Sequence, residues 1–241
     1  MCEYMNAMIF AAGLGTRLQP LTNHKPKALV DFKGQPLLWH AIQNVISAGV
    51  ERIVINVHHF ADQIIRFINS NHWECEILIS DESDLLLDTG GGLIYAKSRF
   101  LPNQSILVQN ADIVISTNLK KFIHSHSESG NDATLMVKNR NTTRYLLFDE
   151  QYDLAGWKNA KTKEIIHVEG KSVQHEFGFC GVHIIEPRLV EAMGEVRPFS
   201  IIQAYLQLAN NYQIKGYQIG DNEKWFDIGS VQKLKEADKN Y

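Results

Sequence analysis

The sequence has little cysteine and no long apolar run. Its three cysteines, Cys2, Cys75 and Cys180, are odd in number and widely spaced, and no C-x-x-C pair occurs, which argues against a disulfide framework or a structural zinc site. We expect them to be reduced, with Cys75 and Cys180 in the core. The sequence shows neither a transmembrane helix nor a secretion signal. We therefore expect a cytoplasmic protein that does not bind a membrane.

The chain also lacks a strong excess of charge of either sign. It has 24 basic and 27 acidic residues and a formal net charge of -3, which gives no reason to expect nucleic acid as a partner. Any anion must then be bound by a local cluster of residues. With 241 residues, 44% of them hydrophobic, the chain is long enough for one sizeable core, and we expect a single domain over 1–241. Both a monomer and a dimer are compatible with the sequence.

Several familiar site motifs are missing. No P-loop string G-x-x-x-x-G-K-[ST] occurs, and the third glycine of a dinucleotide fingerprint is replaced by Leu18. No G-x-S-x-G nucleophile motif is present. The histidine pairs 58–59 and 124/126 lack a third ligand at a recognised spacing for zinc, and we expect most histidines on the surface or in loops.

One stretch near the start of the chain organises the rest. Residues 8–12 form an apolar run ending in two alanines, and Gly13 and Gly15 follow, a pattern that predicts a buried strand opening into a loop that a ligand can approach closely. Arg17 and Lys27 bring positive charge to this loop. Main-chain N–H groups beside Arg and Lys suit phosphate, so we predict a phosphate-handling site.

The order of periodic segments predicts an α/β fold. Strands and helices alternate over the first part of the chain, which implies βαβ units, a parallel sheet and ligand binding at the carboxyl ends of its strands. From Ala133 onward short strand-like runs separated by polar turns predict an antiparallel or mixed extension. We expect a Rossmann-like, mixed but mainly parallel sheet flanked by helices. The predicted helices are 35–48, 61–69 and 93–99, and the predicted strands are 52–57, 75–79, 105–109, 133–138, 145–149, 164–168 and 177–185.

The string A-A-G-L-G-T-R-L-Q-P-L-T from Ala11 to Thr22, followed by P-K-A-L-V at 26–30, resembles the opening of sugar-1-phosphate nucleotidylyltransferases. The alternative is a glycine-rich turn with a solvated arginine. The resemblance implies that Lys27 contacts both substrates. It also implies that the following residues bind the nucleotide: Ala11, Ala12, Gly13, Gly15, Thr16 and Arg17.

A second glycine cluster follows at 88–92. Three adjacent glycines weaken a helix interior, so the bare backbone is either required by a ligand or belongs to a flexible linker. The string L-D-T-G-G-G resembles the E-T-G-G-G segment of N-acetylmuramate-1-phosphate uridylyltransferases, with Asp88 in place of Glu. The resemblance implies that Asp88, Thr89, Gly90 and Gly91 contact the nucleotide.

Two aspartates are the predicted metal ligands. Asp112 follows an apolar strand directly, where a carboxylate stands at the ligand-binding edge of the sheet and is the kind of oxygen donor that Mg²⁺ takes. The alternative is an aspartate in a turn or a helix cap. The family usually shows N-G-D where this chain has Asn110-Ala111-Asp112. The resemblance implies that Asn110 also contacts the nucleotide. Asp227 matches the second aspartate of the family in W-x-D-[IV]-G-[TS].

Two further positions are expected on the acceptor side. Lys158 stands where many relatives have a Glu-Lys-Pro string whose lysine contacts sugar phosphate, and a surface lysine in a turn is the alternative. Gly181 lies in F-G-F-C-G-V, which resembles the sugar-facing segment of the family. The alternative for Gly181 is a glycine that eases a twisted strand.

The resemblance implies that an NTP and a sugar 1-phosphate react to an NDP-sugar and pyrophosphate with Mg²⁺, and that Arg17, Lys27, Asp112 and Asp227 are catalytic. We expect UTP and N-acetylmuramate 1-phosphate, or a related sugar 1-phosphate, as substrates. One alternative is a mannose- or heptose-1-phosphate guanylyltransferase. Another alternative is a non-catalytic regulatory protein that binds nucleotide sugars. Such a protein would be indicated by the loss of Arg17, Lys27 or either aspartate, and all four are present.

Overall fold

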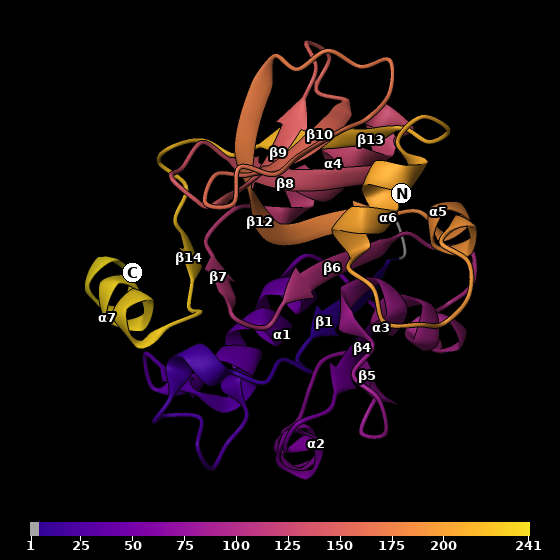
Figure 1. Ribbon diagram of the computed structural model, residues 1–241. Helices are drawn as coiled ribbons and strands as arrows, with labels where there is room; N and C mark the ends of the chain where they lie inside the picture. Colours follow the sequence, from indigo (N-terminus) through magenta and orange to yellow (C-terminus); the bar gives the residue numbers. More distant parts are fainter. Residues whose placement is uncertain (1–4) are drawn as a thin grey trace.

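A mixed β-sheet runs through the computed structural model, which describes residues 5–241 (Figure 1). Its strand order is β5-β4-β1-β6-β12-β8-β13, and within residues 5–241 the pairs formed by β12 are antiparallel while the other neighbours in this order are parallel. The predicted mainly parallel sheet is thereby confirmed. The strands are β1 (Asn6–Phe10), β4 (Arg52–Val57), β5 (Glu76–Asp81), β6 (Ile106–Asn110), β8 (Ala133–Lys138), β12 (His175–Ile185) and β13 (Ile214–Gln218).

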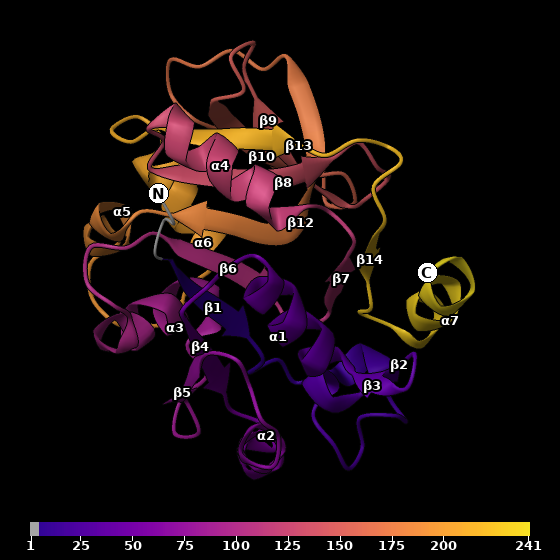
Figure 2. The same cartoon turned by 180° about the vertical axis from the view of Figure 1, so that it is seen from behind.

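Helices cover both faces of this sheet, as the opposite views of Figures 1 and 2 show. Because successive strand residues point to opposite faces, Ile9 and Ile55 join one hydrophobic core while Met8 and Val54 join the other. The first core includes α1 (Leu37–Ser47), α2 (Ala61–Asn69) and α4 (Leu119–Ser129). The second includes α3 (Asp88–Ala96), α5 (Pro187–Ala192) and α6 (Ile201–Leu208).

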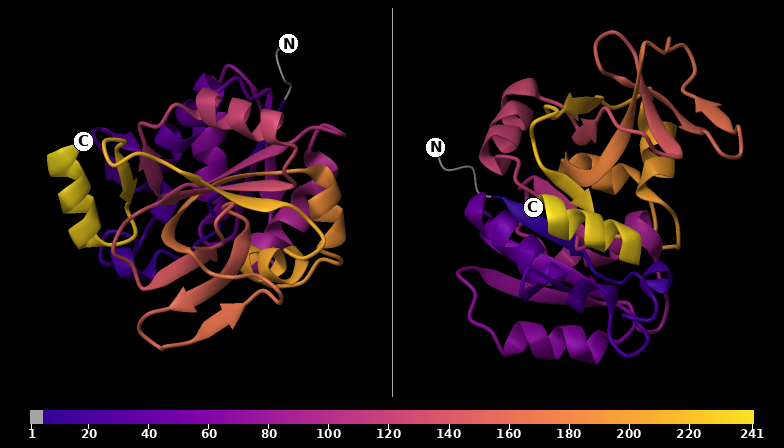
Figure 3. Two further views of the ribbon diagram at one scale, coloured as in Figure 1. Left: turned by 90° about the horizontal axis from the view of Figure 1, so that it is seen from above. Right: turned by 90° about the vertical axis from the view of Figure 1, so that its left-hand side faces the viewer.

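An antiparallel extension lies at the end of the molecule away from α2 (Figures 1 and 3). The strands β9 (Arg144–Phe148), β10 (Leu154–Asn159) and β11 (Ile165–His167) pair antiparallel, and β9 joins the first residues of β12. β12 therefore belongs to both parts of the sheet. Its register shifts between Phe179 and His183, and Gly181 takes a positive φ of 72° there, a conformation that favours glycine. The predicted extension is confirmed.

The C-terminal segment of the chain packs against segments from the first half of the sequence. β14 (Trp225–Asp227) pairs antiparallel with β7 (Ile113–Ile115), and α7 (Val231–Asn240) lies beside the hairpin of β2 (Asp31–Phe32) and β3 (Gln35–Pro36) (Figure 2). A small core of Leu18, Phe32, Ile228 and Ala237, with their neighbours, joins these segments. The remaining short helices are the 3-10 turns η1 (Thr16–Leu18), η2 (Lys27–Leu29) and η3 (Lys97–Arg99).

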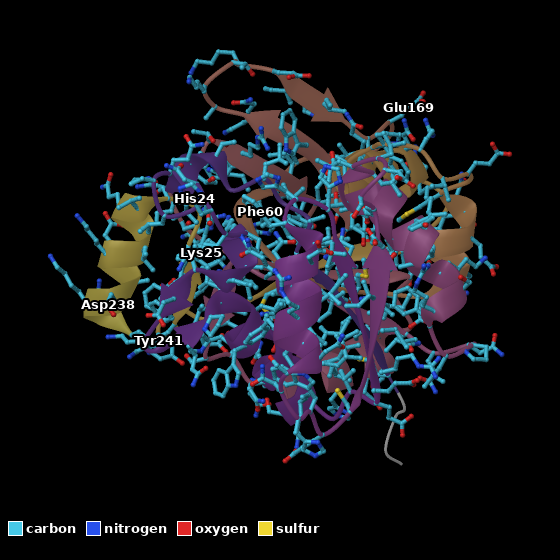
Figure 4. The ribbon with its side chains drawn as sticks, turned by 90° about the horizontal axis from the view of Figure 1, so that it is seen from below. His24, Lys25, Phe60, Glu169, Asp238 and Tyr241 are labelled. Carbon is cyan, nitrogen blue, oxygen red and sulfur yellow. The ribbon has the colours of Figure 1, made fainter. Side chains whose placement is uncertain are left out.

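Figure 4 labels Asp238 in α7 and Tyr241 just after it. Tyr241 packs edge-to-face on Phe32 with ring centroids 5.2 Å apart, and Lys33 Nζ lies 3.1 Å from Asp238 Oδ1. These contacts hold the end of the chain against the β2–β3 hairpin.

The structure differs from the sequence-based expectation at several places. The glycine cluster is the start of α3, which begins at Asp88 and ends at Ala96, so the helix predicted at 93–99 starts earlier and ends sooner. Most histidines lie at exposed or half-buried positions, as expected, and His126 and His183 are the buried exceptions.

The described cysteines differ in their burial. Cys180 is buried, as expected, and burial raises the pKa of its thiol to about 12. Cys75 is half-buried rather than fully in the core, and burial raises its pKa to about 11. Cys2 lies outside the described residues. Of the helices in residues 5–241, none combines the length and the apolar character that crossing a membrane requires.

Candidate active site

The first glycine loop, residues 11–15, connects β1 to the turn η1 at the carboxyl end of the sheet. Gly15 has φ +67°, and a Cβ there would lie 2.9 Å from Lys27 Cβ. Its carbonyl oxygen accepts hydrogen bonds from Leu18 N at 2.9 Å and Thr22 Oγ1 at 2.8 Å. Gly13, in contrast, has no heavy atom within 4 Å of its Cβ position. Gly15 thus serves the fold of the loop, whereas Gly13 faces open space.

A pocket of about 370 Å³ opens at this loop. Its lining includes eight residues predicted from the sequence to bind substrate or metal. These residues are Ala11, Ala12, Gly13, Lys27, Asp88, Thr89, Asn110 and Asp112. The structure therefore brings the two glycine clusters and the strand end at Asn110 to one cavity.

The glycines of the second cluster face the protein itself. A Cβ on Gly90 would lie 2.2 Å from the ring of Phe199, and a Cβ on Gly91 would lie 2.1 Å from the Arg197 carbonyl oxygen. The N–H of Gly90 donates to the Phe199 carbonyl at 2.9 Å. Gly90 and Gly91 are thus required for close packing of α3 on the segment before α6, and this packing places Thr89 in the pocket lining.

A buried polar link, missed by the sequence analysis, joins the two glycine clusters. Asn56 Oδ1 accepts a hydrogen bond from the N–H of Ala11 at 2.8 Å, and Asn56 Nδ2 donates to Glu82 Oε1 at 2.8 Å. Glu82 Oε2 accepts from the N–H of Leu87 at 3.1 Å. Burial raises the pKa of Glu82, although these hydrogen bonds act against the rise. The available signal was a polar residue near the end of each of two predicted strands.

The two predicted metal ligands come together through the pairing of β7 with β14. Asp227 lies opposite Ile113 in this pairing, and the N–H of Ile228 donates to the Asp112 carbonyl at 2.8 Å. Each carboxylate has a lysine partner: Lys27 pairs with Asp112, and Lys233 Nζ lies 2.5 Å from Asp227 Oδ2. Within residues 5–241 no cluster of three or more His, Cys, Asp or Glu side chains is placed to hold a metal.

Arg17 lies beside Asp227. A Cβ on Gly229 would lie 3.3 Å from Arg17 Nη2 and 2.7 Å from Asp227 Oδ1, so both side chains reach the same point. Both also line a second pocket of about 920 Å³. Asp112 lines the first pocket and Asp227 the second, so the β7–β14 pairing places one predicted metal ligand in the lining of each cavity.

The loop that leads to Lys27 is held by α2. Gln63 Nε2 donates to the His24 carbonyl at 2.9 Å. Figure 4 labels His24 and Lys25 on this loop and Phe60 at the residue before α2. Lys27 therefore starts its turn from a fixed position.

Some predicted residues lie elsewhere. Lys158 pairs with Glu176 and lies over the Tyr145 ring at 5.2 Å, and it is absent from the lining of the two pockets described within residues 5–241. Gly181 lies against Asn110: a Cβ added at Gly181 would lie 2.9 Å from Asn110 Nδ2. Thr16 and Gly15 also belong to neither lining.

A glycine loop at the carboxyl edge of a mainly parallel sheet, with basic residues and two aspartates beside it, is an arrangement suited to handling nucleotide phosphates. The chain belongs to the nucleotidyl transferase family, whose sequence model matches residues 6–155. The predicted family and enzyme class, a sugar-1-phosphate nucleotidyltransferase, are thereby confirmed.

Known relatives are similar to this chain over most of its length. The N-acetylmuramate alpha-1-phosphate uridylyltransferase of Caulobacter vibrioides is 30% identical over 233 residues, covering 94% of this chain and 92% of that protein. The mannose-1-phosphate guanylyltransferase catalytic subunit beta of Drosophila pseudoobscura pseudoobscura is 28% identical over 92% of this chain, which spans 58% of that relative. The crystal structure of HddC from Yersinia pseudotuberculosis has the same fold, with a TM-score of 0.76 at 22% identity and 98% coverage of both chains.

Proposed function

We propose that the protein transfers the uridylyl group of UTP to N-acetylmuramate 1-phosphate or a related sugar 1-phosphate and releases pyrophosphate. The observation that carries the proposal is the pairing of β7 with β14, which sets Asp112, in the pocket of Lys27, beside the strand of Asp227, in the pocket of Arg17. Neighbouring pockets with basic and acidic residues suit a reaction between two phosphates. The choice of UTP is supported by the relative that this chain matches over nearly its whole length.

The nucleotide side is built from main-chain donors. The N–H of Ala11 is used by Asn56, whereas within residues 5–241 the N–H groups of Ala12 and Gly13 have no hydrogen-bond partner. These two groups line the first pocket and would donate to the phosphates of the nucleotide. The open space at Gly13 allows this close approach.

The reaction needs no side chain as a base, since the attacking phosphate oxygen is already an anion. The barrier comes from repulsion between two polyanions and from charge that grows on the leaving pyrophosphate. In the proposal Arg17 neutralises the pyrophosphate, and Lys27, which lines the first pocket beside Asp112, holds both substrates in line. Gly90 and Gly91 act on the nucleotide through the position of Thr89.

Asp112 and Asp227 fit a divalent metal. Their side chains are partly buried, 19% and 23% exposed, and they border cavities in which phosphates would meet a negative carboxylate unless a cation stood between them. One or two carboxylates, here Asp112 in the turn before β7 and Asp227 on β14, completed by substrate phosphates, are a usual donor set for Mg²⁺. Bound there, Mg²⁺ would polarise the α-phosphate.

A panel of pyrophosphate-release assays tests the proposal, pairing UTP, GTP, CTP and dTTP with several sugar 1-phosphates, with and without Mg²⁺. The expected result is highest kcat/KM for UTP with N-acetylmuramate 1-phosphate and loss of turnover with EDTA. Highest activity for GTP with mannose 1-phosphate would establish the guanylyltransferase alternative instead. Nucleotide-sugar binding without turnover across the panel would favour a regulatory binding protein.

A further inference from the structure

One arginine in the second pocket is held in place without an acidic partner. Arg140 follows β8 and lines this pocket. Its Nη2 donates to the Phe179 carbonyl at 2.9 Å, and its Cζ lies 4.3 Å from the centroid of the Trp225 ring. A Cβ on Gly178 would lie 2.8 Å from Cζ. The guanidinium thus packs against both the Gly178 backbone and the Trp225 ring, and only a glycine leaves room for it.

The partial burial of this guanidinium has a cost in free energy. Within residues 5–241 no carboxylate oxygen lies within 4.0 Å of it, and its Nε is buried without a hydrogen-bond partner. Burial lowers the pKa of Arg140, which is the mark of a partly desolvated charge. Nη1 is not among the buried atoms and makes no hydrogen bond in the described part of the chain. The charge of Asp227 acts on this guanidinium from a distance, but Asp227 is paired with Lys233. A desolvated cation without a carboxylate in contact costs free energy, which an anionic ligand at the Nη1–Nη2 edge would offset.

The pocket around Arg140 suits a sugar with more than one negative group. Its lining has four basic residues against two acidic ones, in a chain of net charge -3, and Asp227 is already paired with Lys233. Arg17 stands beside Asp227, where the phosphates meet, so its charge is used there. Aromatic rings (Tyr145, Trp157, Phe179) and polar groups (Thr142, Thr143, Gln203) complete the wall.

We propose that Arg140 is a specificity residue that binds a carboxylate carried by the acceptor sugar, in addition to the phosphate held elsewhere. The inference rests on the proposed transfer to a sugar 1-phosphate and narrows it to acidic sugars. A guanidinium presents parallel N–H donors that match a carboxylate. Its fixed position means that little side-chain freedom is lost on binding.

Two acceptors that differ in the carboxylate test this role: N-acetylmuramate 1-phosphate and N-acetylglucosamine 1-phosphate, which lacks the lactyl group. Arg140→Met should lower kcat/KM for the first about 100-fold, as expected for a lost charge-assisted pair. For the second, the change should stay within about threefold. Arg144→Met is the matched control, because Arg144 lines the same pocket but is exposed. It should leave the ratio of the two kcat/KM values unchanged.

The possible outcomes separate this inference from the proposed function. Equal losses for both acceptors in Arg140→Met, or the same change of ratio in Arg144→Met, would overturn the carboxylate role. If Arg140→Met does not fold, the ratio of the two kcat/KM values is measured instead for the wild type and for the conservative variant Arg140→Lys. Equal kcat/KM of the wild type for both acceptors would overturn the inference, while the proposed transfer itself would stand. Failure of the wild type with every sugar 1-phosphate would instead remove the proposed function.

Discussion

The side-chain oxygen of Asn56 accepts a 2.8 Å hydrogen bond from the main-chain N–H of Ala11. Through its Nδ2 the same side chain reaches Glu82, whose carboxylate also holds the N–H of Leu87 just before α3. Both walls of the pocket at the first glycine loop are therefore fixed to one buried polar link. Asn56 itself lines the pocket, so a change here should affect both stability and nucleotide binding.

Replacing this asparagine tests the link. Asn56→Leu leaves a buried N–H without an acceptor and Glu82 without one of its donors, and should lower the free energy of unfolding by about 2–4 kcal/mol. The KM for the nucleotide should rise as well. Urea denaturation and steady-state kinetics measure the two effects. The exposed Asn71→Leu should stay within about 0.5 kcal/mol, and equal stability of the two variants would contradict the assignment.

The two glycine clusters should respond differently to a methyl group. Gly13→Ala should fold with a stability within about 0.5 kcal/mol of the wild type, because nothing lies within 4 Å of its Cβ position. Its KM for UTP should rise about tenfold, since the methyl group stands where phosphate would approach.

Gly91→Ala should instead destabilise the protein by about 2–3 kcal/mol, because the added Cβ meets the Arg197 carbonyl, which is backbone and cannot rotate away. Thermal unfolding and nucleotide titration separate the two classes. A destabilised Gly13→Ala with normal KM would reverse our assignment of this residue.

His183 predicts a pH dependence of stability. Burial lowers its pKa to about 3, and neither ring nitrogen has a hydrogen-bond partner within residues 5–241. The folded state therefore keeps His183 neutral, whereas in the unfolded state the imidazole binds a proton below its ordinary pKa of 6.5. Stability is lost as the pH falls from 6.5 toward 3, by up to about 1.4 kcal/mol per pH unit from this residue.

His183→Leu removes this contribution. The difference in unfolding free energy between the variant and the wild type should grow in favour of the variant between pH 7 and pH 5. Chemical denaturation at several pH values measures it. A difference that does not change with pH would show that His183 does not titrate as proposed.

Two lysines that the sequence placed at the site should differ in their effect on catalysis. Lys27 lines the nucleotide pocket and pairs with Asp112, so Lys27→Met should lower kcat/KM by about 100-fold or more. Lys158 pairs with Glu176, and Lys158→Met should change it by about threefold at most. Pyrophosphate release measures both. A comparable loss in Lys158→Met would support the sequence-based prediction that Lys158 contacts sugar phosphate.

The sequence was most informative where chemistry depends on local order. Residues 8–15 indicate a strand that opens into a loop, and the structure places Gly13 in the lining of the pocket. Asp112 directly follows an apolar strand, and the strand end indeed lies at the cavity. These features follow from neighbouring residues and need no knowledge of distant contacts.

Long-range packing could not be read from the chain. Glycine is needed at positions 90 and 91 because Phe199 and Arg197, far away in the sequence, pack closely against them. Without that knowledge the glycines suggested a loop rather than the first turns of a helix. Asn56 is an ordinary polar residue until folding brings it to Ala11. His183 gives no sign of its burial, because its pattern resembles that of any strand residue.

The central claim is that the two aspartates joined by the β7–β14 pairing promote transfer together. The most direct test is pyrophosphate release from saturating UTP and N-acetylmuramate 1-phosphate with Mg²⁺, for the wild type, Asp112→Asn and Asp227→Asn. Each substitution should lower turnover about 1000-fold or more, because it removes an interaction with transition-state charge. The fold should stay intact, since the lost ion pair with Lys27 or Lys233 should shift thermal unfolding only modestly. Turnover of either variant within about threefold of the wild type would contradict the account.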